Sequence, residues 1–224
     1  TVQGLEVAWT YRTGDYPPSE GPNRRFEATP LKIGDSLYFC TPRNDIVALN
    51  AETGEERWRF NAQVNLRGVT GSAACRGVAY TKLPEPQPGG VCQERIYGPT
   101  VDARLLAVDA KTGQPCADFG VNGQVDLKKG MGEIIPGYYY VSSMPQVVRG
   151  KVVMGGWVSD GQMTGEPSGV IRAFDATTGA FAWAFDMGKP DFHGEPAAGE
   201  HYTRGTPNSW GPISADDQLG MVYI

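Results

Sequence analysis

Three side chains in this sequence have chemistry suited to binding a small ligand or an ion. Trp210, in the segment TPNSW, offers an indole, the largest aromatic face available for stacking. Arg76, in CRGVAY, offers a guanidinium fork that can engage a carboxylate through paired hydrogen bonds. Asp160, in GGWVSDGQ, offers the oxygen ligands that hard divalent cations prefer. These residue types indicate a binding site, provided that the fold brings them together.

Each of the three also has a purely structural interpretation. Trp210 could be a half-buried loop tryptophan, and Arg76 could form a surface salt bridge. Asp160 precedes a glycine, and Asp-Gly after an apolar run is a common signal for a tight hairpin. A turn therefore explains Asp160 as well as a cation does. Glu166, six residues later, is the second candidate for a cation ligand.

Signatures of several other protein classes are absent. The sequence has no Gly-x-Ser-x-Gly elbow, Walker loop, HExxH or GxGxxG, which argues against hydrolase, nucleotide and nicotinamide chemistry. The two histidines, His193 and His201, have no metal-ligand spacing and are predicted to be loop residues. A net charge of −5 without clustered Lys and Arg argues against a nucleic-acid partner. No apolar run approaches the roughly 18 residues of a membrane span.

One pattern that occurs three times predicts how the chain is built. An alternating apolar strand, a turn with Asn or Asp followed by Thr-Gly, and a second strand recur at 46–60, 105–119 and 171–185. The turn side chains can accept backbone hydrogen bonds, and the glycines permit positive φ. The sequence therefore predicts three hairpins.

Tryptophans mark the same repeat. Trp58 and Trp183 stand four residues after the repeat glycine, Trp9 resembles the tail of an earlier copy, and the middle copy has Ala117 instead. We expect these three tryptophans to dock neighbouring units in the core. Trp210 lies outside this register, which is why it is the candidate for a site.

Further strand pairs precede the hairpins, at 29–41 and 145–157, which makes four short strands per unit. This count predicts an all-β fold, a β-propeller of four-stranded antiparallel blades. The repeat glycines are 59 residues apart (54 to 113) and then 66 (113 to 179), whereas a minimal blade needs about 40–45 residues. We expect the excess to form mouth-loop insertions at 63–96, 119–142 and 187–209, where ligands bind.

The size of the chain predicts an incomplete ring. A closed propeller takes about four to eight blades, and 224 residues at about 60 per blade hold three full blades plus parts of two more. We therefore expect residues 1–224 to be part of one propeller domain in a longer polypeptide.

Four cysteines, at 40, 75, 92 and 116, follow none of the CxxC spacings of zinc or haem sites. In an oxidising compartment they could pair in three ways. Cys75 with Cys92, which flank the Pro-rich stretch LPEPQPGG, is the first choice, and four buried thiols are the alternative.

Several of these segments together resemble the quinoprotein dehydrogenases: the Thr-Gly hairpins, FEATPLKIGDSLYFCT, CRGVAY, SGVIRAFDATTG and TPNSW. The sequence is most similar to the membrane-bound glucose/quinate/shikimate dehydrogenases that depend on pyrroloquinoline quinone (PQQ). The resemblance covers essentially the whole chain. It implies an eight-bladed propeller in the periplasm, often anchored to the inner membrane, with PQQ beside Ca²⁺ or Mg²⁺. It also implies oxidation of a polyol, with electrons passed to ubiquinone.

The resemblance implies roles for individual residues. Trp210 would be the floor under PQQ, and Arg76 would pair with one of its carboxylates. Glu27 in FEATP and Thr100 in YGPTVDARLLAVDA would hydrogen-bond near its acidic groups, although both also fit as polar residues at strand ends. Asp160 would bind the metal. The catalytic base is expected beyond Ile224, so residues 1–224 alone are expected neither to hold PQQ tightly nor to turn over.

Two points stay open at this stage. Glucose-oxidising relatives often have a His where this sequence has Ser72, and the segments RGTPNSW and GYYYVSS favour quinate or shikimate over glucose only by resemblance. The alternative function is a non-catalytic propeller scaffold of the outer-membrane assembly lipoprotein type, which would bind no cofactor.

Overall fold

The structure, a computed structural model, describes residues 2–15, 24–66, 69, 73–85 and 87–224; Ser72 lies outside them. The described residues form β-strands, loops and two short 3₁₀ turns, η1 (Val2–Gly4) and η2 (Pro88–Gly90), with no α-helix among them. The prediction of an all-β chain is therefore confirmed for the described part.

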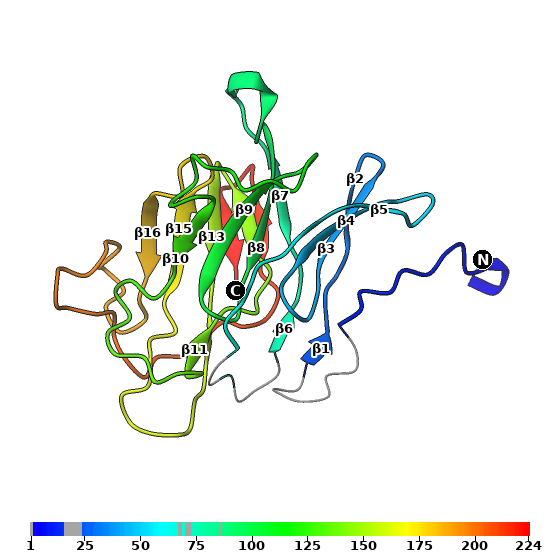
Figure 1. Cartoon of the computed structure of the whole chain (residues 1–224). Coiled ribbons are helices and arrows are strands. Elements are labelled where there is room, and N and C mark those ends of the chain that lie inside the picture. Colours follow the sequence, from blue (N-terminus) through cyan, green and yellow to red (C-terminus); the bar gives the residue numbers. More distant parts are fainter. Residues whose placement is uncertain (1, 16–23, 67–68, 70–72, 86) are drawn as a thin grey trace.

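Three four-stranded antiparallel sheets make up the body of the molecule, and in each sheet the strands follow sequence order. The first sheet is β2 (Leu31–Ile33), β3 (Ser36–Cys40), β4 (Ile46–Asn50) and β5 (Glu56–Phe60). The second is β7 (Ala79–Lys82), β8 (Glu94–Pro99), β9 (Arg104–Asp109) and β10 (Gln124–Asp126). The third is β12 (Gln146–Val148), β13 (Lys151–Met154), β15 (Ile171–Asp175) and β16 (Phe181–Phe185). They follow one another across the molecule as blades of a propeller do (Figure 1), which confirms the predicted architecture.

Three two-stranded ribbons accompany the blades. β1 (Arg24–Phe26) pairs in parallel with β6 (Ala73–Cys75), and β11 (Tyr139–Tyr140) pairs antiparallel with β14 (Trp157–Val158). β17 (Ser214–Asp216) and β18 (Met221–Tyr223) form a hairpin. In Figure 1, β1, β6 and β11 lie at one end of the sheets, and the loop that carries η2 projects from the opposite end.

The middle repeat departs from the predicted hairpin. Residues 114–119 form no strand, and only Pro115 makes an isolated bridge, to Val108, while β9 pairs instead with β10. Proline cannot donate a ladder hydrogen bond, and the next residue, Cys116, is tied to Cys92. The outer strand of this blade is therefore β10, which begins at Gln124, and not the segment that directly follows the Thr-Gly turn.

The loop ranges expected from the repeat spacing also need correcting. The range 63–96 contains β6, β7 and the start of β8, and 119–142 contains β10 and β11, whereas 187–209 is free of strands. The middle blade starts at β7, well before its Thr-Gly turn, so part of the range 63–96 is strand rather than inserted loop.

The disulfide prediction, Cys75 with Cys92, is wrong. The bonds join Cys40 to Cys75 and Cys92 to Cys116, with Cα–Cα distances of 5.9 and 5.7 Å. Cys75 ends β6 and meets the end of β3, whereas Cys92 precedes β8 in the next sheet. Cys75 thus lies beside the first sheet, whereas Cys92 lies in the turn between β7 and β8 of the second sheet.

The turns of the three repeats use the predicted chemistry. In each, the side-chain Oδ1 of the Asn or Asp accepts two backbone N–H bonds from the residues two and three positions later (Asn50, Asp109 and Asp175). Burial by itself would raise the pKa of Asp175, but Lys151 and the N–H groups of Thr177 and Thr178 outweigh it and hold the pKa at about 2.

Two tryptophans pack on the turns of the first and second repeats. Trp9 covers Gly54, and Trp58 covers Gly113, where a Cβ would lie 2.6 Å from Trp58 Cε3. Trp58 Nε1 and the Tyr38 hydroxyl both donate to the Ala110 carbonyl, at 3.1 and 3.0 Å. This docking needs a glycine, both for the positive φ and for the close approach of the indole.

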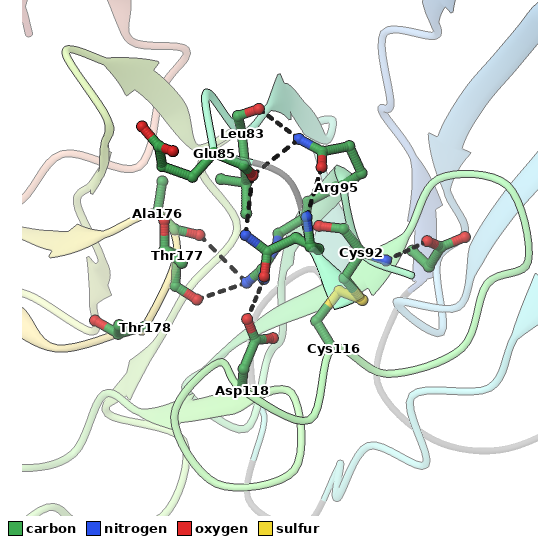
Figure 2. A network of polar contacts seen from close by, with 12 residues as sticks. Leu83, Glu85, Cys92, Arg95, Cys116, Asp118, Ala176, Thr177 and Thr178 are labelled. Atoms are coloured by element: carbon green, nitrogen blue, oxygen red, sulfur yellow. Dashed lines mark hydrogen bonds and ion pairs between the residues drawn. A yellow bond between two sulfur atoms is a disulfide. The ribbon is translucent and has the colours of Figure 1, made fainter. Parts of the chain in front are cut away.

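Where the middle repeat lacks its tryptophan, a fully buried arginine makes the contact with the next blade (Figure 2). Arg95 Nη1 donates to the Thr177 carbonyl at 2.6 Å and Nε donates to the Cys92 carbonyl at 2.9 Å, while Nη2 pairs with Asp118. The Tyr97 hydroxyl donates to the Ala176 carbonyl, as Tyr38 does one blade earlier. Polar contacts thus join these two blades, while Gly179, the counterpart of Gly113, meets Gly120 and Val125 instead of an indole.

Replacing Gly113 by Ala tests the docking. We expect Gly113→Ala to lower the free energy of unfolding by about 2–4 kcal/mol, because it adds a clash with Trp58 to the cost of a positive φ. Gly34→Ala is the matched control: its φ is +58° and nothing lies within 4 Å of a Cβ, so it should cost about 1 kcal/mol. Denaturant unfolding measures both. Equal losses would contradict the docking argument.

Arg95→Met tests the buried polar contact. It removes this donor from the carbonyls of Cys92 and Thr177, and buried carbonyls without a donor are costly, so we expect a loss of about 3 kcal/mol. Arg57→Met removes an exposed pair with Asp35 and should cost below about 1 kcal/mol. A similar small loss for both variants in thermal or denaturant unfolding would show that Arg95 is dispensable.

Candidate functional site

Arg76 lies at the centre of a polar cluster beside an exposed indole. Its Nη2 forms an ion pair with Glu27 Oε2 at 2.8 Å, and its Nη1 donates to Ser142 Oγ at 2.6 Å. The guanidinium carbon lies 4.9 Å from the centre of the Trp210 ring. The fold thus brings together Arg76, Glu27 and Trp210, which are separated by up to 183 residues in the sequence (27 to 210).

The β1–β6 ribbon positions the charged pair. Phe26 and Cys75 are the last paired residues of the two parallel strands, so Glu27 and Arg76 leave the ribbon side by side. The backbone of Arg76 is held on both sides: its N–H donates to the Ser142 carbonyl at 3.2 Å, and its carbonyl accepts from Thr29 N–H at 2.9 Å. The guanidinium is therefore fixed by backbone and side-chain contacts together.

Two glycines position the segment that carries Trp210. A Cβ on Gly169 would lie 1.8 Å from the Pro207 carbonyl oxygen, and one on Gly155 would lie 2.4 Å from that of Ser209. Gly169 N–H also donates to Thr206 Oγ1 at 2.9 Å. Thr206–Trp210 thus lies directly against the backbone at Gly155 and Gly169. The Trp210 side chain remains 48% exposed, so the indole is accessible for stacking.

Asp160 and Asn208 form a second polar pair near this segment. Asn208 Nδ2 lies 3.4 Å from Asp160 Oδ2, and Asn208 Oδ1 is buried without a hydrogen-bond partner. An unpaired buried carbonyl and an exposed carboxylate are both ligands that a hard cation accepts. Within the described ranges, however, no three His, Cys, Asp or Glu side chains gather as a metal-binding group. Two oxygen donors are fewer than the coordination sphere of Ca²⁺ or Mg²⁺ requires.

Glu166, the second candidate for a cation ligand, is occupied within its own loop. Its Oε1 accepts the backbone N–H groups of Gln162 and Met163, and these bonds lower the pKa of the carboxyl group. The side chain is buried and stabilises the turn that follows Asp160. The contacts indicate a structural role for this residue.

Thr100 does not point its hydroxyl at the Arg76 cluster. The side chain is fully buried, and Oγ1 bonds Asp102 Oδ1 at 2.6 Å and accepts the Arg104 N–H at 2.9 Å. Its link to the site is through the backbone, because the Thr100 carbonyl accepts from Val141 N–H, the neighbour of Ser142. Thr100 thus supports the segment that carries Ser142.

Sequence reasoning missed three residues of this region. Ser142 bonds Arg76, Asn208 holds the unpaired carbonyl, and Trp157 stacks on Tyr140 with centroids 4.3 Å apart. Burial raises the pKa of Tyr140 to about 12, so this hydroxyl stays protonated at neutral pH. The polar run after the tyrosines in GYYYVSS was a usable signal for Ser142, whereas nothing in the local sequence marks Asn208.

These residues fit a planar, acidic cofactor such as PQQ along one edge and one face. The guanidinium has more N–H donors than its contacts with Glu27 and Ser142 use, so it can also bind a carboxylate. The unpaired Asn208 carbonyl and the Trp210 indole supply an acceptor and a stacking surface nearby.

A search of the described part of the chain for membrane-spanning helices finds none with the necessary length and apolar character.

Comparisons with known proteins identify the family of the chain. The family model of the glucose/ethanol/alcohol dehydrogenase β-propeller domain, designated PQQ, matches residues 1–224. The large subunit of the glycerol dehydrogenase of Gluconobacter oxydans (strain 621H) is 46% identical over 224 residues, covering 98% of this chain and 30% of that protein. The quinate/shikimate dehydrogenase (quinone) of Acinetobacter baylyi is 38% identical over 239 residues, covering 100% and 29%.

A solved structure shares the fold. The quinohemoprotein alcohol dehydrogenase ADHIIG of Pseudomonas putida HK5 superposes with a TM-score of 0.60 at 25% identity, over 91% of this chain and 28% of that one. The chain thus spans about 30% of the length of the curated relatives named above. Because the family model covers every residue from 1 to 224, the chain belongs to the family of PQQ-dependent quinoprotein dehydrogenases, within their β-propeller domain.

Proposed function

We propose that this chain supplies one side of the PQQ site of a dehydrogenase that oxidises a polyol. The observation that carries the proposal is the convergence of Glu27, Arg76 and Trp210, three residues expected from sequence to serve one cofactor. A salt bridge alone would need no exposed indole beside it, and the indole is 48% exposed. The family match makes a non-catalytic scaffold the weaker alternative.

In this proposal each residue has a distinct task. Arg76 binds a carboxylate of PQQ, while Glu27 and Ser142 hold the plane of the guanidinium. Trp210 supports a face of the ring system by stacking. When bound, PQQ supplies the quinone that accepts two electrons from the alcohol. No residue of the chain is assigned as the catalytic base.

We further propose that Asp160 and the Asn208 carbonyl contribute ligands to a Ca²⁺ or Mg²⁺ ion. Both are oxygen donors. The Asn208 amide Nδ2 lies 3.4 Å from Asp160 Oδ2, which places the two side chains next to each other, and the Asn208 carbonyl oxygen has no hydrogen-bond partner. Asn208 is two residues from Trp210, so a cation held there would lie close to a cofactor stacked on the indole. The remaining ligands would come from the cofactor, water or other parts of the protein.

The substrate is proposed only as a class. Relatives named for glycerol, quinate or shikimate, and glucose are 46%, 38% and 37% identical to the chain, and all of these substrates carry several hydroxyl groups. The higher identity to the glycerol enzyme gives no support to the initial preference for quinate or shikimate. Ubiquinone remains the proposed electron acceptor. The two disulfides support a periplasmic location, because such bonds persist in oxidising compartments.

Arg76→Ala and Trp210→Ala test the cofactor site in the full-length protein. We expect the dissociation constant of PQQ to rise about 10–100-fold for Arg76→Ala, because a charge-assisted bond is lost, and about tenfold for Trp210→Ala. Equilibrium dialysis of PQQ with the metal present measures both constants. Arg57→Ala and Trp183→Phe are controls that lie in blade strands. Unchanged affinity in both site variants would rule out this PQQ site.

Gly169→Ala tests whether the backbone contact under Thr206–Trp210 positions the indole. The added Cβ would collide with the Pro207 carbonyl, so the segment must shift, and we expect at least about a tenfold loss of PQQ affinity. Gly211→Ala is the matched control, because nothing lies within 4 Å of its Cβ position. The fluorescence of Trp210, compared with that of Trp210→Phe in each background, reports the shift without turnover. Equal affinity in both alanine variants would contradict the positioning role.

A further inference from the structure

One of the two disulfides ends directly at the candidate site. Cys75 is the last residue of β6 and immediately precedes Arg76, and its partner Cys40 is the last residue of β3. Both side chains are 1% exposed. The bond therefore joins the strand that carries the guanidinium to a buried strand of the first blade.

The element that carries the charged pair is weak by itself. β1 and β6 are three residues long each, pair in parallel and, within the described ranges, have no third strand beside them. Short two-stranded ribbons are marginal in water, and parallel pairing is slightly less stable per residue than antiparallel pairing. By contrast, β3 lies inside a four-stranded antiparallel sheet and is paired on both sides. The disulfide thus connects a marginal element to a firm one.

The contacts of Arg76 at the end of the β1–β6 ribbon depend on the position of β6. The Glu27–Arg76 ion pair exists because both strands end in register at Phe26 and Cys75. A rotation or slip of β6 would separate the guanidinium from Ser142 and from the Trp210 ring together. Holding Cys75 at β3 removes this freedom before any ligand binds, which is the condition for preorganised binding.

We propose that the Cys40–Cys75 disulfide is a positioning element for Arg76, whose guanidinium it holds ready for a carboxylate of the cofactor. The inference rests on the proposed function, because the effect it assigns to the disulfide is tighter binding of PQQ. The other disulfide, Cys92–Cys116, lies beside Arg95 at the interface of the second and third blades (Figure 2). It stabilises the fold and leaves Arg76 in place.

The two disulfides provide a matched comparison within the full-length protein. Cys40→Ser/Cys75→Ser and Cys92→Ser/Cys116→Ser each remove one bond, and PQQ affinity is measured by equilibrium dialysis alongside the midpoint of thermal unfolding. Variants are used because a thiol reductant would also reduce the quinone. We expect both pairs to lower the midpoint, and only the Cys40/Cys75 pair to raise the PQQ dissociation constant, by about tenfold or more.

A double-mutant comparison separates positioning from general stability. If the disulfide acts through Arg76, Cys40→Ser/Cys75→Ser should weaken PQQ binding in the native background but add nothing in Arg76→Ala. An equal weakening in both backgrounds, or by both disulfide variants, would overturn the inference. Unchanged affinity in Cys40→Ser/Cys75→Ser alone would overturn it too, while leaving the site intact if Arg76→Ala still binds weakly. If Arg76→Ala itself binds normally, the proposed function fails first.

An apolar variant covers the case in which buried serines prevent folding. Cys40→Val/Cys75→Ala removes the bond without adding a hydroxyl, and the same loss of affinity is expected. If neither Cys40/Cys75 variant folds while Cys92→Ser/Cys116→Ser does, the bond is needed for the fold itself, and the positioning role is wrong.

Discussion

The whole arrangement depends on how one sheet packs on the turn of the next. At each of the two interfaces between full blades, a tyrosine hydroxyl from one blade donates to an alanine carbonyl in the turn of the following one, Ala110 or Ala176. The other contacts differ between the two interfaces. Trp58 packs on Gly113 at the first, whereas Arg95 donates to the Thr177 carbonyl at the second. These contacts fix the position of each four-stranded sheet relative to the next. They therefore also set the positions of the ribbons and loops at the ends of the sheets.

The candidate site lies outside the blade repeats, as expected for residues that bind rather than support. Glu27 and Arg76 follow the β1–β6 ribbon, and Trp210 comes from a segment held against two glycines of the third-blade region. Different contacts hold the two segments. A disulfide and backbone hydrogen bonds lie next to Arg76, and the segment that carries Trp210 is in close backbone contact with the two glycines. The site therefore combines parts that are far apart in sequence and individually weak.

The repeated parts of the fold were predictable because their signals are local. Thr-Gly turns, their Asn or Asp hydrogen bonds and the first and third hairpins depend on residues within a few positions of one another. The middle hairpin was predicted incorrectly because the repeat pattern alone was followed there. Pro115 and the disulfide at Cys116 interrupt the outer strand that this pattern implied. The disulfide prediction failed because Cys75 ends β6 beside the first sheet, whereas Cys92 lies in the turn before β8 of the second sheet.

The sequence alone determined the fold class, the four-stranded unit, the docking of Trp9 and Trp58 and the residue types of the candidate site. Turn chemistry and strand periodicity act over short stretches, so they can be recognised without knowing the neighbours. Only the tertiary structure decided that Arg76, Glu27 and Trp210 meet, that Ser142 joins them, and that Thr100 turns its hydroxyl away. Those outcomes depend on strand register and on which segments cross at the sheet ends. Long-range packing sets both, and no local pattern encodes them.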